Sequence, residues 1–195
     1  MSPDFSILRC LRRLRLRWCM GWLLLAMLAQ VRAQTAPPPV LERQVMAAYL
    51  LKFASFVEWP DTSFARPDSV LLIGVAGSEA LAEQLERMAA GRSVNGHPLK
   101  VRRVTASAPT GDLHMLFIDS AMDRGALAAL LGAAHGRSLL TVSDAPDSDA
   151  SGCMINFVVA EYKLRVDVLL RHVGPSGLRI SARMLAVAHR VQGAT

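Results

Sequence analysis

Residues 45–60 read VMAAYLLKFASFVEWP, a stretch with the pattern of an amphipathic helix that ends before a proline. On a helical wheel, one half of the circumference is apolar and holds Val45, Met46, Tyr49, Leu50, Phe53, Phe56 and Val57. The other half is polar, apart from Leu51. The residue before Pro60 is biased toward extended backbone, which ends the helix there. We therefore predict a helix over residues 41–57 whose aromatic side packs against a sheet.

Downstream of this helix, short apolar runs alternate with helical patterns. The runs predict strands at residues 70–75, 99–104, 113–118 and 138–142. A helix of residues 79–90 fits between the first two strands, with Ser78 as its N-cap and Gly91 as its stop. A second helix, capped by Asp119 and Ser120, should run to about residue 134. Strands separated by helices of this length are typical of βαβ units, so we predict a single α/β domain with a mostly parallel sheet and right-handed crossovers.

The last third of the chain predicts a hairpin-like pair of strands, residues 154–159 and 164–168. The connection between them lacks the Asn-Gly or Asp-Gly of the tightest hairpins, which leaves the turn type open. In the second strand, apolar residues alternate with Arg165 and Asp167, so one face of the strand should be exposed to water. This polar face is either a solvated surface or a contact for a partner.

The end of the chain predicts two flanking helical segments. Residues 169–172 have the pattern of a single helical turn. Ser181 is placed as the N-cap of a closing helix that should run to about Gln192, and Gly193 follows as its stop.

The positive charge of the chain is concentrated at its N-terminus. Residues 1–33 hold six of the 22 Lys and Arg residues and one of the 16 acidic residues, so the remainder is nearly neutral in spite of a net charge of +6. This distribution argues against nucleic-acid binding by the folded part. The arginine-rich start, the apolar run at 18–29 and the small residue Ala33 are typical of a secretory signal peptide that is cleaved before Gln34.

The apolar run at 18–29 is shorter than the ~20 residues that a membrane span needs, and an uncleaved anchor is the alternative to a signal peptide. We predict export to the periplasm through a cleavable signal peptide (residues 1–33), followed by a Pro-rich leader (34–40) and one folded domain (41–195). Cleavage would leave Cys153 as the one cysteine of the mature chain, which excludes an intramolecular disulfide. We expect a buried small hydrophobe there; an intermolecular disulfide is the alternative.

Small polar residues follow three of the predicted strands at their carboxyl ends: Gly77, Ser78, Asp119, Ser120, Ser143 and Asp144. In open α/β sheets, ligands bind at this edge. One hypothesis is therefore a periplasmic sensor that holds a small ligand in these loops. The alternative is a set of ordinary turns and caps, because the loop after the first strand is neither a complete phosphate-binding nor a complete dinucleotide-binding motif.

The sequence offers little support for catalysis or metal binding. Its five histidines are scattered, and none lies four residues from another as in a helical metal site. It contains no Gly-x-Ser-x-Gly motif of the kind that presents a nucleophilic serine. We predict that the protein is not an enzyme and uses neither a metal nor another cofactor.

Two ordered blocks of the sequence resemble the YfiR family of periplasmic proteins. The first block holds Ala48, Tyr49, Leu50, Phe53, Phe56, Trp59 and Pro60, and the second holds Gly152, Met154, Ile155, Asn156, Phe157, Lys163, Arg165 and Asp167. Residues 177–181 and Leu185 are similar to the family's C-terminal signature. The resemblance covers roughly residues 42–191.

This resemblance implies a regulatory binding protein that represses a membrane-bound diguanylate cyclase. Binding to the periplasmic sensor domain of the cyclase would lower cyclic di-GMP signalling and biofilm formation. The resemblance also implies a homodimer. Because aromatic residues and arginine dominate interface energies, we predict partner contacts at Phe53, Phe56, Glu58, Trp59, Arg165 and Asp167, although the aromatic residues are equally suited to a core. Some family members carry cysteine pairs linked to redox sensing, and this sequence lacks them.

Overall fold

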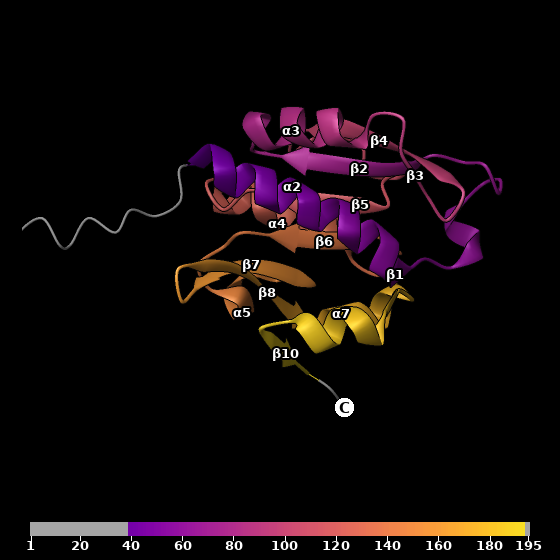
Figure 1. The fold of residues 1–195 in the computed structure, drawn as a ribbon. Helices are drawn as coiled ribbons and strands as arrows, with labels where there is room; N and C mark the ends of the chain where they lie inside the picture. Colours follow the sequence, from indigo (N-terminus) through magenta and orange to yellow (C-terminus); the bar gives the residue numbers. More distant parts are fainter. Residues whose placement is uncertain (1–38, 194–195) are drawn as a thin grey trace, which may run out of the picture. The chain divides into compact units, whose positions relative to one another are not determined.

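The computed structural model describes residues 39–193 (Figure 1). The predicted signal peptide lies outside the described residues, as does the predicted leader except for its last two residues. Those two residues already belong to the first helix described, which begins at Pro39.

The described residues form ten short strands, six helices and two 3-10 turns. The helices are α2 (Pro39–Phe56), α3 (Glu79–Ala89), α4 (Arg124–Ala134), α5 (Ser148–Ser151), α6 (Leu170–Val173) and α7 (Ala182–Val187), and the 3-10 turns are η2 (Asp61–Ser63) and η3 (Gly174–Ser176). The strands are β1 (Val57–Glu58), β2 (Leu71–Ala76), β3 (Ser93–Val94), β4 (His97–Val104), β5 (Met115–Ile118), β6 (Leu140–Ser143), β7 (Ile155–Ala160), β8 (Lys163–Leu169), β9 (Arg179–Ile180) and β10 (Arg190–Gln192).

Eight of the strands form one mixed sheet in the order β10-β8-β7-β6-β5-β2-β4-β3. Its centre, from β7 to β4, is parallel throughout. Antiparallel pairing occurs between β7 and β8 and between β3 and β4. The predicted single α/β domain with a mostly parallel sheet and a late antiparallel strand pair is therefore confirmed. The other two strands, β1 and β9, form a separate antiparallel pair.

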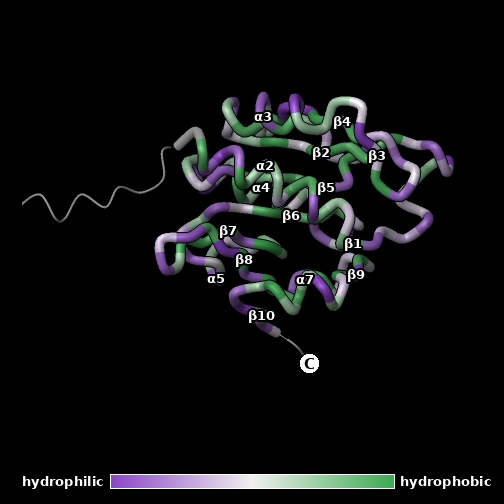
Figure 2. Tube along the Cα trace, viewed as in Figure 1, coloured by the Kyte–Doolittle hydropathy of each residue, from purple (hydrophilic) through white to green (hydrophobic). Residues whose placement is uncertain are grey.

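Helices cover both faces of the large sheet. Helices α2, α3 and α7 contribute to a hydrophobic cluster on one face, and α4 contributes to a second cluster on the other face. Figure 1 shows α2 running diagonally across the sheet. The central strands β2 and β5 are apolar along most of their length (Figure 2), as expected for strands that are buried on both faces.

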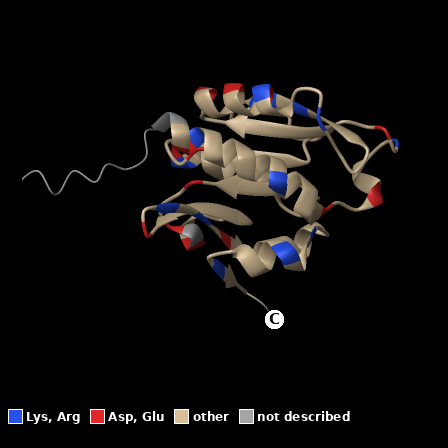
Figure 3. Ribbon diagram, in the orientation of Figure 1, with Lys and Arg blue, Asp and Glu red and all other residues tan. Residues whose placement is uncertain are grey.

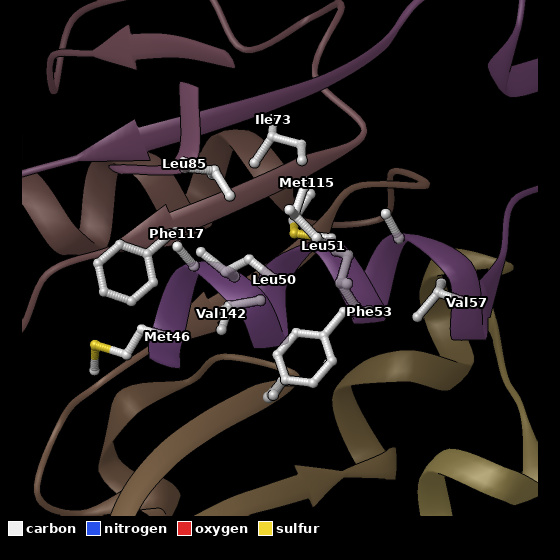
Figure 4. Close-up of a cluster of buried hydrophobic side chains, with 14 of the residues drawn as sticks. Met46, Leu50, Leu51, Phe53, Val57, Ile73, Leu85, Met115, Phe117 and Val142 are labelled. Atoms are coloured by element: carbon white, nitrogen blue, oxygen red, sulfur yellow. The ribbon is translucent and has the colours of Figure 1, made fainter. Parts of the chain in front are cut away.

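Helix α2 buries more of its circumference than an amphipathic stripe requires. Met46, Leu50 and Phe53 pack onto the sheet, as the wheel predicts. Leu51, the apparent misfit, is only 7% exposed and joins the same cluster (Figure 4). Because α3 packs beside α2, a second side of the helix is covered. Burying a leucine of this kind stabilises the fold by about 1.5–3 kcal/mol.

Two predicted helices have different bounds in the structure. The helix expected to follow Asp119 and Ser120 begins only at Arg124, because Asp123 is its N-cap and accepts a hydrogen bond from the backbone N–H of Ala126. Asp119 instead closes a local turn by accepting from the N–H of Ala121. The prediction of a cap at Asp119 and Ser120 is therefore wrong.

The closing helix is also shorter than predicted. Ser181 caps it as expected, since its Oγ accepts from the N–H of Met184. However, α7 ends at Val187, and the predicted last turn is the strand β10. This strand pairs in parallel with β8, and sheet hydrogen bonds replace the helical ones.

The β7–β8 turn consists of Glu161 and Tyr162. Both residues adopt left-handed backbone, with φ of 52° and 59°. A two-residue hairpin with positive φ at both positions matches the right-handed twist of its strands. The turn therefore forms without the Asn or Gly that usually favours it.

Candidate functional site

A groove of about 380 Å³ lies between α2, β8 and α7. We call it the α2–α7 groove. Its lining residues come from three separate parts of the chain: Tyr49, Lys52, Phe53 and Phe56 from α2, Arg165 and Val166 from β8, and Arg183, Met184, Val187 and Ala188 from α7 and its end.

The two helical walls are held together at one end of the groove. Helix α2 leads directly into β1, and β9 leads into α7 through Ser181. Pairing of Val57 with Ile180 and of Glu58 with Arg179 joins the two segments. The backbone N–H of Ser181 also donates to the carbonyl of Phe56 at 2.9 Å. The β1–β9 ladder therefore sets the spacing between α2 and α7.

The base of the groove is aromatic and closely packed. Phe53 is only 3% exposed and stacks on Phe157 of β7, with ring centroids 5.7 Å apart. Tyr49 meets the edge of the same Phe157 ring at 5.9 Å. Phe56 is half-buried at the groove wall. Phe53 is thus a core side chain beneath the surface, whereas Tyr49 and Phe56 are partly accessible to a partner.

Three basic residues surround this apolar base: Lys52, Arg165 and Arg183. Arg165 lies 3.7 Å from the carboxylate of Glu161, which is itself 85% exposed. Among the described residues, no acidic side chain forms an ion pair with Lys52 or Arg183. In Figure 3, the ribbons of both α2 and α7 carry segments coloured for basic residues. The groove therefore combines an apolar base with an excess of positive charge.

The structure separates the other predicted partner residues from this groove. Glu58 is exposed at the β1–β9 ladder. Trp59 is half-buried, and its indole Nε1 donates to the carbonyl of His114 at 3.0 Å. The aromatic residues of the 53–59 motif therefore lie in two places. Phe53 and Phe56 line the groove, whereas Trp59 packs at the start of the loop to β2.

Asp167 is buried, which corrects the prediction of a water-exposed strand face at this position. It is only 3% exposed. The guanidinium of Arg190 donates a hydrogen bond to one oxygen of its carboxylate at 2.9 Å. Nδ1 of His189 lies within hydrogen-bond distance of the other oxygen, at 3.0 Å. Strand β10, which the sequence analysis missed, supplies the arginine and covers this edge of β8. Of the two polar residues on this face of β8, Arg165 is the accessible one.

The predicted ligand loops at the carboxyl edge of the sheet do come together. Arg43, from the N-terminal part of α2, lies 3.3 Å from the carboxylate of Asp119 and 3.1 Å from that of Asp144. The N–H of Ser120 donates to the other oxygen of Asp144 at 2.8 Å. A ligand at this edge would compete with Arg43 for the two carboxylates.

The remaining loop residues have structural roles. Gly77 has a φ of 84°, and a Cβ there would lie 2.6 Å from Cγ of Met122. Ser143 accepts from the N–H of Ala145. Ser78 occupies the N-cap position of α3 without a side-chain capping bond. Gly77 thus lies in a bend after β2, Ser143 is the last residue of β6, and Ser78 lies at the start of a helix.

A histidine–phenylalanine stack, also missed from the sequence, anchors the loop between β1 and β2. The ring of Phe64 lies between His97 and His114, with centroid distances of 3.7 Å and 4.5 Å. His114 is 7% exposed, and burial lowers the pKa of its imidazole. The stack fixes the loop against β4 and β5.

Cys153 is a buried free thiol, as expected. Burial raises its pKa to about 12, so the reactive thiolate is disfavoured. Within residues 39–193, no group of three or more His, Cys, Asp or Glu side chains is arranged to hold a metal ion. Every helix in that range is too short or too polar to cross a membrane.

Comparison with known proteins identifies the family. No curated protein matches the sequence significantly. The model of the YfiR/HmsC-like family, however, matches residues 43–189, which include every residue that lines the α2–α7 groove. This is a regulatory family of periplasmic repressors of diguanylate cyclases. The chain belongs to the YfiR/HmsC-like family.

Proposed function

We propose that this protein represses a membrane-bound diguanylate cyclase by binding the cyclase's periplasmic sensor domain through the α2–α7 groove. Repression would lower cyclic di-GMP and, with it, biofilm formation. The observation that carries the proposal is the groove itself: partly accessible aromatic side chains and basic side chains gather on one surface. Aromatic residues and arginine are the side chains that contribute most to protein interfaces.

The packing beneath the groove and the pairing of its walls support this role. Phe53 and Phe157 are packed in the core beneath it, and the β1–β9 ladder ties its two walls. A preformed surface loses little conformational entropy when a partner binds. Phe56 and Arg165 are the two predicted partner residues that remain accessible there, so we assign the contact to them and to neighbouring groove residues. The side chains of Trp59 and Asp167 are engaged within the chain.

Repression requires that the protein favour one state of its partner. A cyclase that exchanges between inactive and active arrangements is shifted only by a ligand that binds the two with different affinity. Moving such an equilibrium from mostly active to mostly inactive requires roughly a 10⁴-fold preference for the inactive state. We therefore propose that the groove engages a segment of the sensor domain that is accessible only in the inactive arrangement.

Export to the periplasm through the signal peptide at residues 1–33 and assembly as a homodimer complete the proposal. The signal peptide would bring the protein to the side of the membrane where the sensor domain lies. A homodimer would present two grooves, and two linked contacts bind more tightly than one.

Deleting the gene and measuring cellular cyclic di-GMP tests the proposed function. We expect cyclic di-GMP and biofilm mass to rise in the deletion strain and to return to normal with the wild-type gene. A version without residues 1–33 should fail to complement, because it would remain on the wrong side of the membrane. Unchanged cyclic di-GMP in the deletion strain, with the cyclase expressed, would reject the function.

A further inference from the structure

We infer that the α2–α7 groove binds an acidic amphipathic helix of the partner, with an apolar stripe in the groove and carboxylates against Lys52, Arg165 and Arg183. This inference rests on the proposed function and specifies the chemistry of the segment that the groove recognises.

The shape of the groove fits a helix. Its walls are two helices, and lining residues recur over two turns of α2, at Tyr49, Lys52 and Phe56. On α7 the corresponding positions are Arg183 and Val187. A helix that packs along such walls makes contacts at positions i, i+3 or i+4, and i+7. Two turns correspond to roughly 10 Å of helix.

The positive charge of the groove indicates acidic residues on the partner helix. One basic side chain comes from each element, Lys52 from α2, Arg165 from β8 and Arg183 from α7. Carboxylates placed beside the apolar stripe of a partner helix would meet all three. Complementary charges of this kind raise association rates and exclude partners of the wrong charge.

An exposed valine supports an apolar contact at the rim. Val187 is 76% exposed although its helix packs against the core. The side chain lies beside Arg183 on the same wall of the groove. An apolar side chain on the same wall as a basic one is suited to a partner that carries both an apolar stripe and acidic residues.

A second copy of this chain is a poor occupant for the groove. The most acidic helix described, α3, carries Glu79, Glu83 and Glu86. Arg103 pairs with Glu79 and Glu86, and Arg87 pairs with Glu83. Binding of α3 in the groove of a second copy would therefore have to replace these intrachain ion pairs, which a partner helix with unpaired carboxylates would not.

Binding of the cyclase's purified periplasmic domain to charge-reversal variants tests this inference. The protein is purified from cells that express the full chain, and Kd is measured for the wild type, Lys52→Glu, Arg183→Glu and the double variant. We expect each reversal to weaken binding about tenfold and the pair to weaken it about a hundredfold. Lys100→Glu is the matched control: Lys100 is an exposed residue of β4 and does not line the groove, so Kd should stay unchanged.

Two further measurements do not rely on the charge-reversal variants. The wild-type Kd should rise at least about tenfold between about 50 mM and about 500 mM salt, because salt screens exposed charges. Val187→Ser should weaken binding without altering the oligomeric state. Wild-type binding that is independent of salt, or equal Kd values for the wild type and the double variant, would overturn the acidic-helix inference, whereas the proposed repression of the cyclase would stand.

Two other outcomes would also contradict the inference. If Val187→Ser changes the oligomeric state and not the affinity for the cyclase domain, the groove is a contact between copies of this chain. The inference is then wrong, and so is the assignment of the cyclase contact to this groove. If the wild type shows no binding to the cyclase domain at all, both the inference and the proposed function fail.

Discussion

Nδ1 of His114 accepts a hydrogen bond from the backbone N–H of Leu72 at 3.2 Å. An acceptor nitrogen carries no proton, so the proton of the neutral ring is on Nε2, which donates to the carbonyl of Ser63 at 3.1 Å. This arrangement needs a neutral imidazole. Protonation would place two donors face to face and would weaken the attachment of the loop to β2.

The pH dependence of stability follows from this bond. Burial lowers the pKa of His114 in the folded protein below its usual value of 6.5. The unfolded chain therefore binds more protons than the folded chain as the pH falls below 6.5, and the stability contributed by neutral His114 is lost in that window. We expect the free energy of unfolding to fall by at most about 1.4 kcal/mol per pH unit from this group.

Denaturant unfolding at several pH values checks this prediction. His114→Gln should show a shallower decline between about pH 6.5 and pH 5 than the wild type, because the titrating group is gone. Burial also lowers the pKa of His172. Because His172 is present in both proteins, its contribution to the pH slope cancels in the comparison. The same pH slope in His114→Gln as in the wild type would contradict the assignment.

Asp167 attaches the C-terminal strand to the sheet. Replacing it with Ala removes the carboxylate that binds Arg190 and His189, so we expect a loss of about 1–3 kcal/mol in the free energy of unfolding. The backbone N–H of His189, which donates to the carbonyl of Val166, should exchange its hydrogen faster.

The matched control for Asp167 is an exposed ion pair. Asp68→Ala removes a partner of Arg66 at a site where both side chains are well exposed, and it should change stability by less than about 1 kcal/mol. Equal effects of Asp68→Ala and Asp167→Ala would show that the buried pair has no special role.

Arg43 joins the start of α2 to the ends of β5 and β6. In Arg43→Ala, the carboxylates of Asp119 and Asp144 lose their shared partner while remaining largely buried. We expect a loss of about 1–3 kcal/mol in the free energy of unfolding, with partial recovery in Arg43→Lys, which restores one charge without the planar fork. Thermal unfolding that is unchanged in Arg43→Ala would refute this role.

Local patterns predicted most of the fold, and long-range pairing accounts for the errors. The alternation of apolar runs and helices correctly predicted the parallel sheet. The closing helix was extended too far because helical spacing alone cannot show that Arg190 pairs with Asp167, far back along the chain. Leu51 looked misplaced for the same reason: its burial depends on α3, a neighbour that a helical wheel does not include.

The candidate site was likewise predicted only in part from the sequence. Phe53, Phe56 and Arg165 belonged to motifs that the sequence singled out, and the structure brings them to one groove. Lys52 and Arg183 were missed because an isolated basic residue on a helix is usually ordinary surface. Only the packing of α7 beside α2 places them around the same apolar base.

Binding of the full protein to the periplasmic domain of its cyclase tests the central claim most directly. Calorimetric titration should be combined with an assay of cyclic di-GMP synthesis in membranes that contain the intact cyclase. The account predicts saturable binding, synthesis that falls as the protein is added, and a weaker effect for Lys52→Glu/Arg183→Glu than for Lys100→Glu. Full synthesis in the presence of saturating wild-type protein would contradict it.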